Sequence, residues 1–230
     1  MAVKKTRGFL VGLLALVVFA AALSFFPSGK KGSPPEGYAP FRDDALAARY
    51  RPVFDCPEAY GPILAVYYRA ARETGVARET GLIHIAYHPV WARERNGAAG
   101  LKPFLSRALY TGGLSLQRAM FGKGDVESVA LTIDPASGSV LEIRYETARA
   151  YSPGDFSVSH ENIVESHPEA GRPLFAVLSW NHLFRLKGAA SEARAAAERA
   201  PLEYFSEKLW REYEMWKNPE TLLKKNRAHF

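Results

Sequence analysis

Cysteine, nucleophile motifs and nucleotide-binding motifs are scarce or absent in this chain of 230 residues. Cys56 is the single cysteine, so an intrachain disulfide and a zinc site built from several thiolates are both excluded. There is no Gly-x-Ser-x-Gly elbow and no phosphate-binding glycine pattern, which leaves nucleotide binding and that type of serine hydrolase without support. His84 and His88 are four residues apart, but no glutamate follows His84 as the zinc-protease motif requires.

The composition is that of one folded domain with appendages. Hydrophobic residues make up 47% of the chain and charged residues 23%, which is enough apolar material for one sizeable core. The formal net charge of +6 is carried largely by the two ends. Basic residues that flank an apolar segment favour an anionic lipid surface over nucleic acid, so we expect no nucleic-acid partner. The residues concerned are Lys4, Lys5, Arg7, Lys30, Lys31, Lys224, Lys225 and Arg227.

An uncharged apolar run, Phe9–Phe26, follows the basic N-terminus and ends at Pro27. As a helix this run would be about 27 Å long, close to the roughly 30 Å of hydrocarbon in a bilayer. We therefore expect a single-pass membrane anchor with the rest of the chain outside the cytoplasm. The alternative is a signal peptide that is cleaved, which would release a secreted domain.

The chain divides by composition into four parts. Residues 1–27 form the signal anchor or signal peptide, and residues 28–40 form a linker rich in Gly, Pro, Ser and Lys. Residues 41–187 are expected to form a β-rich globular domain, followed by C-terminal helices and a basic tail at 188–230. The predicted fold is mainly β with α: an antiparallel β-sandwich-like domain with C-terminal helices and an N-terminal transmembrane helix.

The clearest local pattern lies between residues 126 and 146. Apolar and polar residues alternate over 126–133 and again over 141–146, which predicts two strands. Between them, Asp134 to Gly138 supplies a proline and a glycine that favour a turn, so we expect an antiparallel hairpin. Elsewhere the patterns predict helices at 43–49, 101–110, 191–200 and 202–217, strands at 63–69, 82–91 and 172–185, and a long loop at 151–171.

Three residues are candidates for ligand binding: Asp125, Glu127 and His182. Glu127 shares a strand face with apolar residues, and a buried carboxylate must be paired, metal-bound or protonated. The competing interpretation is a structural Glu127, either at the rim of the sheet or held by hydrogen bonds. Asp125 and Glu127 could together ligate Ca²⁺ or Mg²⁺, although two carboxylates are fewer than such an ion needs. His182, near a strand end, is the best candidate for an acid, base or ligand.

The other histidines carry less weight. His84 and His88 face one way on a strand but lie about 13 Å apart, too far to share a metal. His160 and His167 fall in the expected loop and could serve as loop ligands, but nothing in the sequence singles them out.

Short motifs also occur in a fixed order, and together they resemble the vacuolar-protein-sorting-sixty-two-type family and, more distantly, the necrosis-inducing proteins. The motifs are Arg51-Pro52, Tyr67-Tyr68 and a strand ending in Trp91, then Gly124-Asp125-Val126-Glu127, then Arg172-Pro173 and a strand ending in Ser179-Trp180-Asn181-His182.

The resemblance covers roughly residues 50–184 and implies a β-sandwich. In the necrosis-inducing proteins, the residues that match Asp125 and Glu127 contribute to a divalent-cation site. The chain departs from the family pattern at Val126, where the family has tryptophan, and at Lys123, near the position where the family has an acidic residue or histidine.

These observations favour a membrane-anchored extracytoplasmic module that binds a ligand or an envelope partner without catalysis. No cofactor is expected, apart from Ca²⁺ or Mg²⁺ at Asp125 and Glu127. The alternative is a divalent-cation-dependent hydrolase or a lipid-interacting enzyme.

Overall fold

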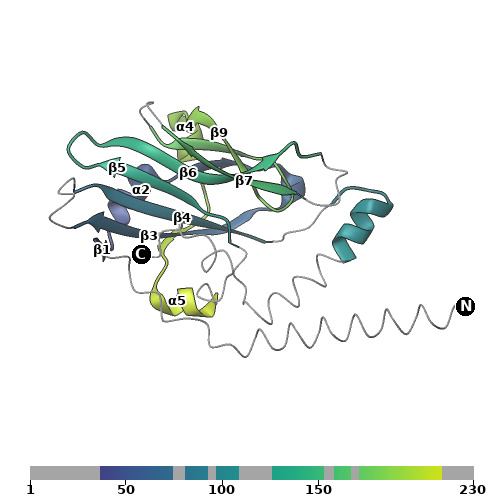
Figure 1. The fold of residues 1–230 in the computed structure, drawn as a ribbon, viewed down its shortest axis with the longest axis horizontal. Helices are drawn as coiled ribbons and strands as arrows, with labels where there is room; N and C mark the ends of the chain where they lie inside the picture. The colour runs from purple at the N-terminus through teal and green to yellow at the C-terminus, as the bar shows by residue number, and fades with distance from the viewer. Residues whose placement is uncertain are drawn as a thin grey trace, which may run out of the picture.

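Strands dominate the part of the chain that the computed structural model describes, which is residues 37–74, 81–92, 97–108, 126–152, 158–166 and 171–213. Figure 1 shows strands in layers, with short helices at their margins. The elements are β1 (Tyr38–Phe41), α2 (Asp44–Tyr50), β2 (Val53–Asp55), the 3-10 helix η1 (Glu58–Tyr60), β3 (Ile63–Glu73), β4 (Ile83–Trp91), β5 (Val129–Asp134), β6 (Ser139–Arg149), β7 (Ser159–Glu165), β8 (Pro173–Val177), β9 (Phe184–Ala189), α4 (Glu192–Ala196), β10 (Leu202–Tyr204) and α5 (Glu207–Glu212). Residues 101–108 are also helical.

The larger sheet has seven strands, in the order β1-β3-β4-β5-β6-β7 with β10 also paired to β3. β1 pairs with residues 70–73 of β3, and β10 pairs with residues 66–68. The pairing is antiparallel throughout this sheet except between β10 and β3, which run parallel. β7 is therefore an edge strand, bonded on one side to β6.

The hairpin between β5 and β6 is held by its turn. The Asp134 side chain accepts hydrogen bonds from the Ala136 amide and the Ser137 hydroxyl, and these bonds lower the pKa of Asp134. Gly138 has a φ of 70°, a conformation that a side chain would strain. Its carbonyl accepts a hydrogen bond from the Tyr50 hydroxyl at 2.8 Å, which ties the turn to α2.

The smaller sheet, in the order β2-β8-β9, covers one face of the larger sheet. Each of its strands contributes one buried phenylalanine, Phe54, Phe175 or Phe184, whose ring centroids lie 5.4 to 6.0 Å apart. Burial of such a side chain stabilises the fold by about 1.5–3 kcal/mol. Both sheets contribute to one core, so the fold is mainly β and sandwich-like. From the larger sheet the core includes Val66, Tyr68, Ile85, Tyr87, Val129, Leu131, Ile143 and Tyr145.

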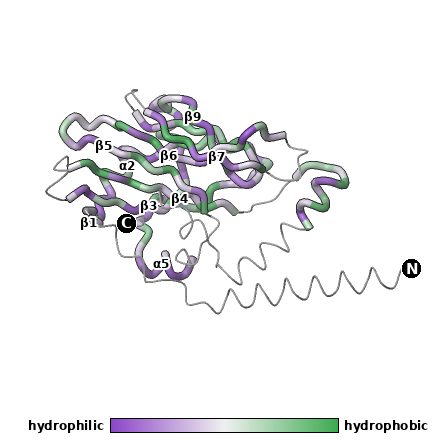
Figure 2. The backbone as a smooth tube through the Cα atoms, in the orientation of Figure 1, coloured by the Kyte–Doolittle hydropathy of each residue, from purple (hydrophilic) through white to green (hydrophobic). Residues whose placement is uncertain are grey.

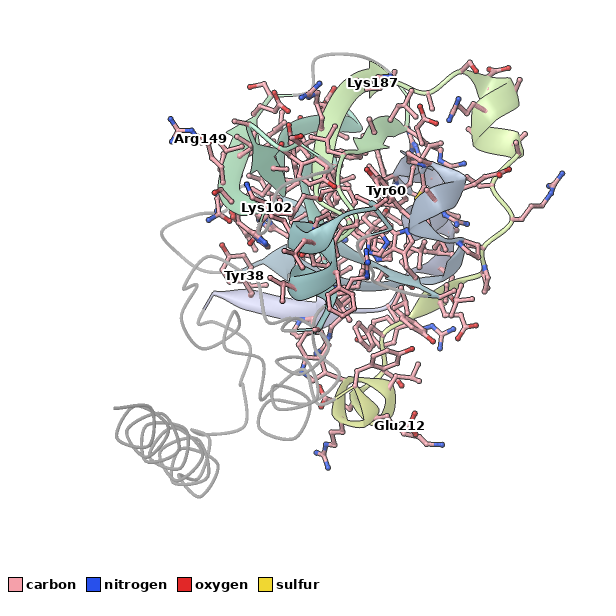
Figure 3. The ribbon with its side chains drawn as sticks, turned by 90° about the vertical axis from the view of Figure 1, so that its right-hand side faces the viewer. Tyr38, Tyr60, Lys102, Arg149, Lys187 and Glu212 are labelled. Carbon is pink, nitrogen blue, oxygen red and sulfur yellow. The ribbon has the colours of Figure 1, made fainter. Side chains whose placement is uncertain are left out.

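On the other face of the larger sheet, α5 packs against β3 and β4. Trp210 of α5 packs on Phe205 with ring centroids 5.0 Å apart, and the Arg69 guanidinium lies 4.7 Å from the Trp210 ring. Figure 2 shows α5 as mostly hydrophilic, as expected of a helix that contacts the sheet through few residues. Figure 3 shows α5, marked by Glu212, and β9, marked by Lys187, on opposite sides of the larger sheet.

Several predictions from the sequence are confirmed. β5 and β6 form the expected antiparallel hairpin. α2 begins after Asp43, whose side chain caps the Leu46 amide at 2.9 Å. Strands β3 and β4 occupy the predicted segments, and residues 101–108 are helical.

Three predictions of secondary structure are wrong. The expected loop at 151–171 contains β7, a polar strand that gains its order by pairing with β6. The expected single strand at 172–185 is two strands, because a turn at 179–182 reverses the chain and gives His182 a positive φ of 63°. The expected helix at 202–217 starts instead with β10, and α5 follows after Ser206.

The apolar run Phe9–Phe26 lies outside the described residues. Within the described ranges, no helix is both long enough and apolar enough to span a membrane.

Candidate metal centre

Glu127 lies just before β5, in a short segment that is not itself a strand. It is 4% exposed, so the structure buries this carboxylate instead of leaving it at a wet rim. A buried carboxylate is costly unless hydrogen bonds or a positive charge compensate it. The groups around the Glu127 carboxylate therefore determine whether it can bind a cation.

Glu146 of β6 and His160 of β7 lie beside one another because of the strand register. His160 pairs opposite Ala148, which is two residues along β6 from Glu146, so both side chains point to the same face. The Nδ1 atom of His160 lies 2.8 Å from Oε2 of Glu146. Glu146 is 2% exposed, whereas the His160 side chain is 35% exposed, so the cluster opens to solvent on the histidine side.

Glu127 joins this pair. One ligand atom each from Glu127, Glu146 and His160 lie within 4.8 Å of one another. Tetrahedral ligands at the usual zinc distances are separated by about 3.3 Å. The side chains need to move inward by no more than about 1.5 Å to hold such an ion, and the contact between His160 and Glu146 must open by about 0.5 Å.

The charges of the cluster also fit a cation. Two ionised carboxylates 4.8 Å apart repel each other by about 3.5 kcal/mol at an effective dielectric constant of 20. A divalent ion between Glu127 and Glu146 replaces this repulsion with attraction. The ligand set combines one nitrogen with two carboxylates, and imidazole nitrogen favours Zn²⁺, Fe²⁺ and similar ions over the Ca²⁺ or Mg²⁺ expected from carboxylates alone.

The outer nitrogen of His160 is also held. The Asn181 side-chain nitrogen lies 3.1 Å from His160 Nε2, and Ser179 Oγ donates to the Asn181 side-chain oxygen at 2.6 Å. Both Asn181 and Ser179 are buried, in the turn between β8 and β9. In metal sites the ligand histidine usually donates its second ring N–H to such a partner, so an asparagine can fill this place when its side-chain oxygen faces Nε2.

His182 lies next to Asn181 but faces elsewhere. Its ring stacks on Trp91 with centroids 4.1 Å apart, and its Nε2 atom lies 3.1 Å from the Tyr60 carbonyl oxygen. Burial lowers the pKa of His182 to about 4, against the hydrogen bond to Tyr60, which raises it. This histidine is neutral at pH 7 and packs the junction between the sheets.

Of the three residues selected from the sequence, the structure places Glu127 in the cluster and His182 outside it. Asp125 lies outside the described residues. His84 contacts Glu73 at 2.9 Å and Thr132 at 3.2 Å, and His88 packs against the rings of Phe205 and Trp210.

Sequence reasoning missed Glu146 and gave His160 only as a residue that could serve as a loop ligand. Residues 159–165 read SHENIVE, a polar segment with two apolar residues, so neither β-propensity nor alternation distinguishes it as a strand. The available signal was the length of the expected loop, since loops of 21 residues are uncommon in compact domains. With β7 recognised, Glu146 and His160 could have been paired.

No protein-family model matches this chain, no curated protein matches it, and no solved structure matches it. The suggested kinship with the vacuolar-protein-sorting-sixty-two-type family therefore stays a prediction.

Proposed function

We propose that this chain is a β-sheet domain that binds a divalent transition-metal ion through Glu127, Glu146 and His160. The observation that carries the proposal is the approach of three ligand atoms, from three separate segments, to within 4.8 Å. The family resemblance, itself a prediction, also implies a cation near Glu127. This proposal gives the expected binding module a specific ligand.

The ion class follows from the donors. One imidazole and two carboxylates suit Zn²⁺, Mn²⁺, Fe²⁺ or Co²⁺. Ca²⁺ prefers six to eight oxygen ligands, more than Glu127 and Glu146 supply together. We therefore expect tighter binding of Zn²⁺ than of Ca²⁺ or Mg²⁺.

A thermal melt of the full chain in detergent tests the proposal. An ion that binds only the folded state, at a free concentration of 100 times its Kd, stabilises that state by about 2.7 kcal/mol. For a domain of this size the Tm should rise by about 5–10 °C relative to the chain in EDTA. If Zn²⁺, Mn²⁺, Fe²⁺ and Co²⁺ all leave the Tm unchanged at millimolar concentration, the proposal is wrong.

β6 provides a matched pair of variants. Glu146→Gln removes a proposed ligand charge, and Glu142→Gln makes the same substitution on the same strand at a residue that pairs with Arg144. The metal-induced rise in Tm should be lost in Glu146→Gln and kept in Glu142→Gln. Equal responses in both variants would place the ion elsewhere.

A second function, metal-assisted hydrolysis, is favoured by one specific observation. Three protein ligands leave a coordination position for water, and the partly exposed His160 places the cluster near solvent. The test is hydrolysis of chromogenic phosphate and acyl esters by the Zn²⁺-loaded chain. Activity that exceeds that of Glu146→Gln incubated with the same Zn²⁺ concentration would support an enzyme, and equal rates would support a non-catalytic binding module.

We also propose that the domain is exported and anchored by Phe9–Phe26. The length of the run supports an anchor, and the basic residues before it support an orientation with the domain outside the cytoplasm. A reporter that is active only outside the cytoplasm, fused after Phe230, should give signal. A silent fusion together with an active cytoplasmic reporter would reverse the orientation.

A further inference from the structure

A directed chain of hydrogen bonds ends at the candidate metal centre. The Leu183 amide donates to Ser179 Oγ at 3.2 Å, and the Ser179 hydroxyl donates to the Asn181 side-chain oxygen at 2.6 Å. The Asn181 side-chain NH₂ group then faces His160 Nε2 at 3.1 Å. Asn181 is 6% exposed and Ser179 is fully buried, so water does not easily replace these contacts.

This series of hydrogen bonds sets the tautomer of His160. An amide NH₂ group can only donate, so Nε2 of His160 must accept and its proton must be on Nδ1. Nδ1 then donates to Oε2 of Glu146 at 2.8 Å. In this arrangement the nitrogen nearest the two carboxylates carries a proton and has no lone pair for a metal ion.

We propose that Asn181 is the positioning residue that lets His160 exchange between this arrangement and a metal-binding one by rotation of its side-chain amide. The inference rests on the proposed function. When Nδ1 binds an ion, neutral His160 carries its proton on Nε2 instead, and the imidazole keeps the same total number of protons. The rotated amide presents its oxygen to the Nε2 proton and its NH₂ group to Ser179 Oγ.

Asparagine suits this role because its amide can serve either tautomer. Aspartate can only accept a hydrogen bond, so it pairs with the metal-binding tautomer, which has its proton on Nε2, and not with the tautomer that has its proton on Nδ1. Leucine, of similar size, serves neither. These differences separate a positioning role from simple packing.

The experiment compares the full-length chain with Asn181→Asp and Asn181→Leu by calorimetric titration with Zn²⁺. We expect Asn181→Leu to weaken Zn²⁺ binding about 10-fold or more, in the range for loss of such an outer partner, and Asn181→Asp to bind at least as tightly as the wild type. If both variants weaken binding equally, the residue acts only as a donor to a fixed histidine and the inference fails. The inference also fails if Asn181→Leu binds like the wild type. No Zn²⁺ binding by the wild type would instead refute the proposed function.

A second measurement follows the tautomer directly. With ¹⁵N-labelled histidine, and His160→Asn for assignment, the wild type in EDTA should show the proton on Nδ1, and the Zn²⁺-loaded chain should show it on Nε2. This readout needs no metal for its first half, so it tests the Asn181 contact even if the proposed function is wrong. A proton on Nε2 in EDTA would overturn the inference.

Discussion

Substitution of Glu127 by glutamine should stabilise the metal-free chain and abolish its response to metal. Glu127 and Glu146 are both buried, and their ligand atoms lie within 4.8 Å of each other. Glutamine keeps the size and shape of glutamate but removes the charge. The substitution therefore tests whether the repulsion between the two carboxylates outweighs the other contacts of Glu127 in the absence of an ion.

The size of the effect follows from the geometry. Two full charges at 4.8 Å and an effective dielectric constant of 20 repel by about 3.5 kcal/mol. Relaxation and solvent at the His160 side reduce the repulsion, so we expect the free energy of unfolding to rise by about 1–3 kcal/mol. For a domain of this size this corresponds to a Tm increase of about 3–10 °C in EDTA. The wild type should gain about 2.7 kcal/mol from an ion at 100 times its Kd, and the variant should gain almost nothing.

The assay is thermal and urea unfolding of the full chain at pH 7, with EDTA and with Zn²⁺. Glu142→Gln on β6 serves as the control, since its exposed pair with Arg144 should change stability by less than about 1 kcal/mol. If Glu127→Gln unfolds more easily than the wild type in EDTA, the two carboxylates do not repel each other in the way described. Other contacts of Glu127 would then dominate its energy, and the reasoning would be refuted.

Three further predictions concern the scaffold. Below pH 6.5 the unfolded chain protonates His182 but the folded chain excludes that proton until about pH 4, so this residue should cost about 3 kcal/mol of stability as pH falls through that window. His182→Asn, which tolerates the positive φ, should flatten the stability profile measured by urea unfolding, and an unchanged slope would contradict the assignment. Tyr87→Phe removes a buried hydrogen bond of 2.8 Å to the Ala47 carbonyl and should lower the free energy of unfolding by about 1–3 kcal/mol in the same assay. Gly138→Ala places a Cβ 3.1 Å from Arg49 at a positive φ and should destabilise by about 1–2 kcal/mol, whereas Gly97→Ala, with no atom within 4 Å, should not.

Much of the scaffold could be predicted from the sequence because its causes are local. Alternation at 126–146, the Asp134 to Gly138 turn and the Asp43 cap each depend on residues close together along the chain. Such signals survive without tertiary contacts, because side-chain direction and turn geometry are set within a few residues.

Selection of Glu127 as a residue of interest also came from the sequence. A carboxylate next to the alternating apolar residues of a strand needs compensation if the fold buries it. The sequence could not supply its partners, however, since Glu146 and His160 are brought to it by strand pairing across separate segments.

Tertiary structure alone decided that residues 159–165 form a strand and that His182 turns away toward Trp91 and Tyr60. An edge strand of polar residues has no periodic pattern of its own, and its order comes from the backbone of β6. The sequence by itself therefore determined the local elements and selected one acidic residue, whose burial the structure then established. The approach of that acid to Glu146 and His160 depends on contacts between distant segments, and only the folded chain could establish it.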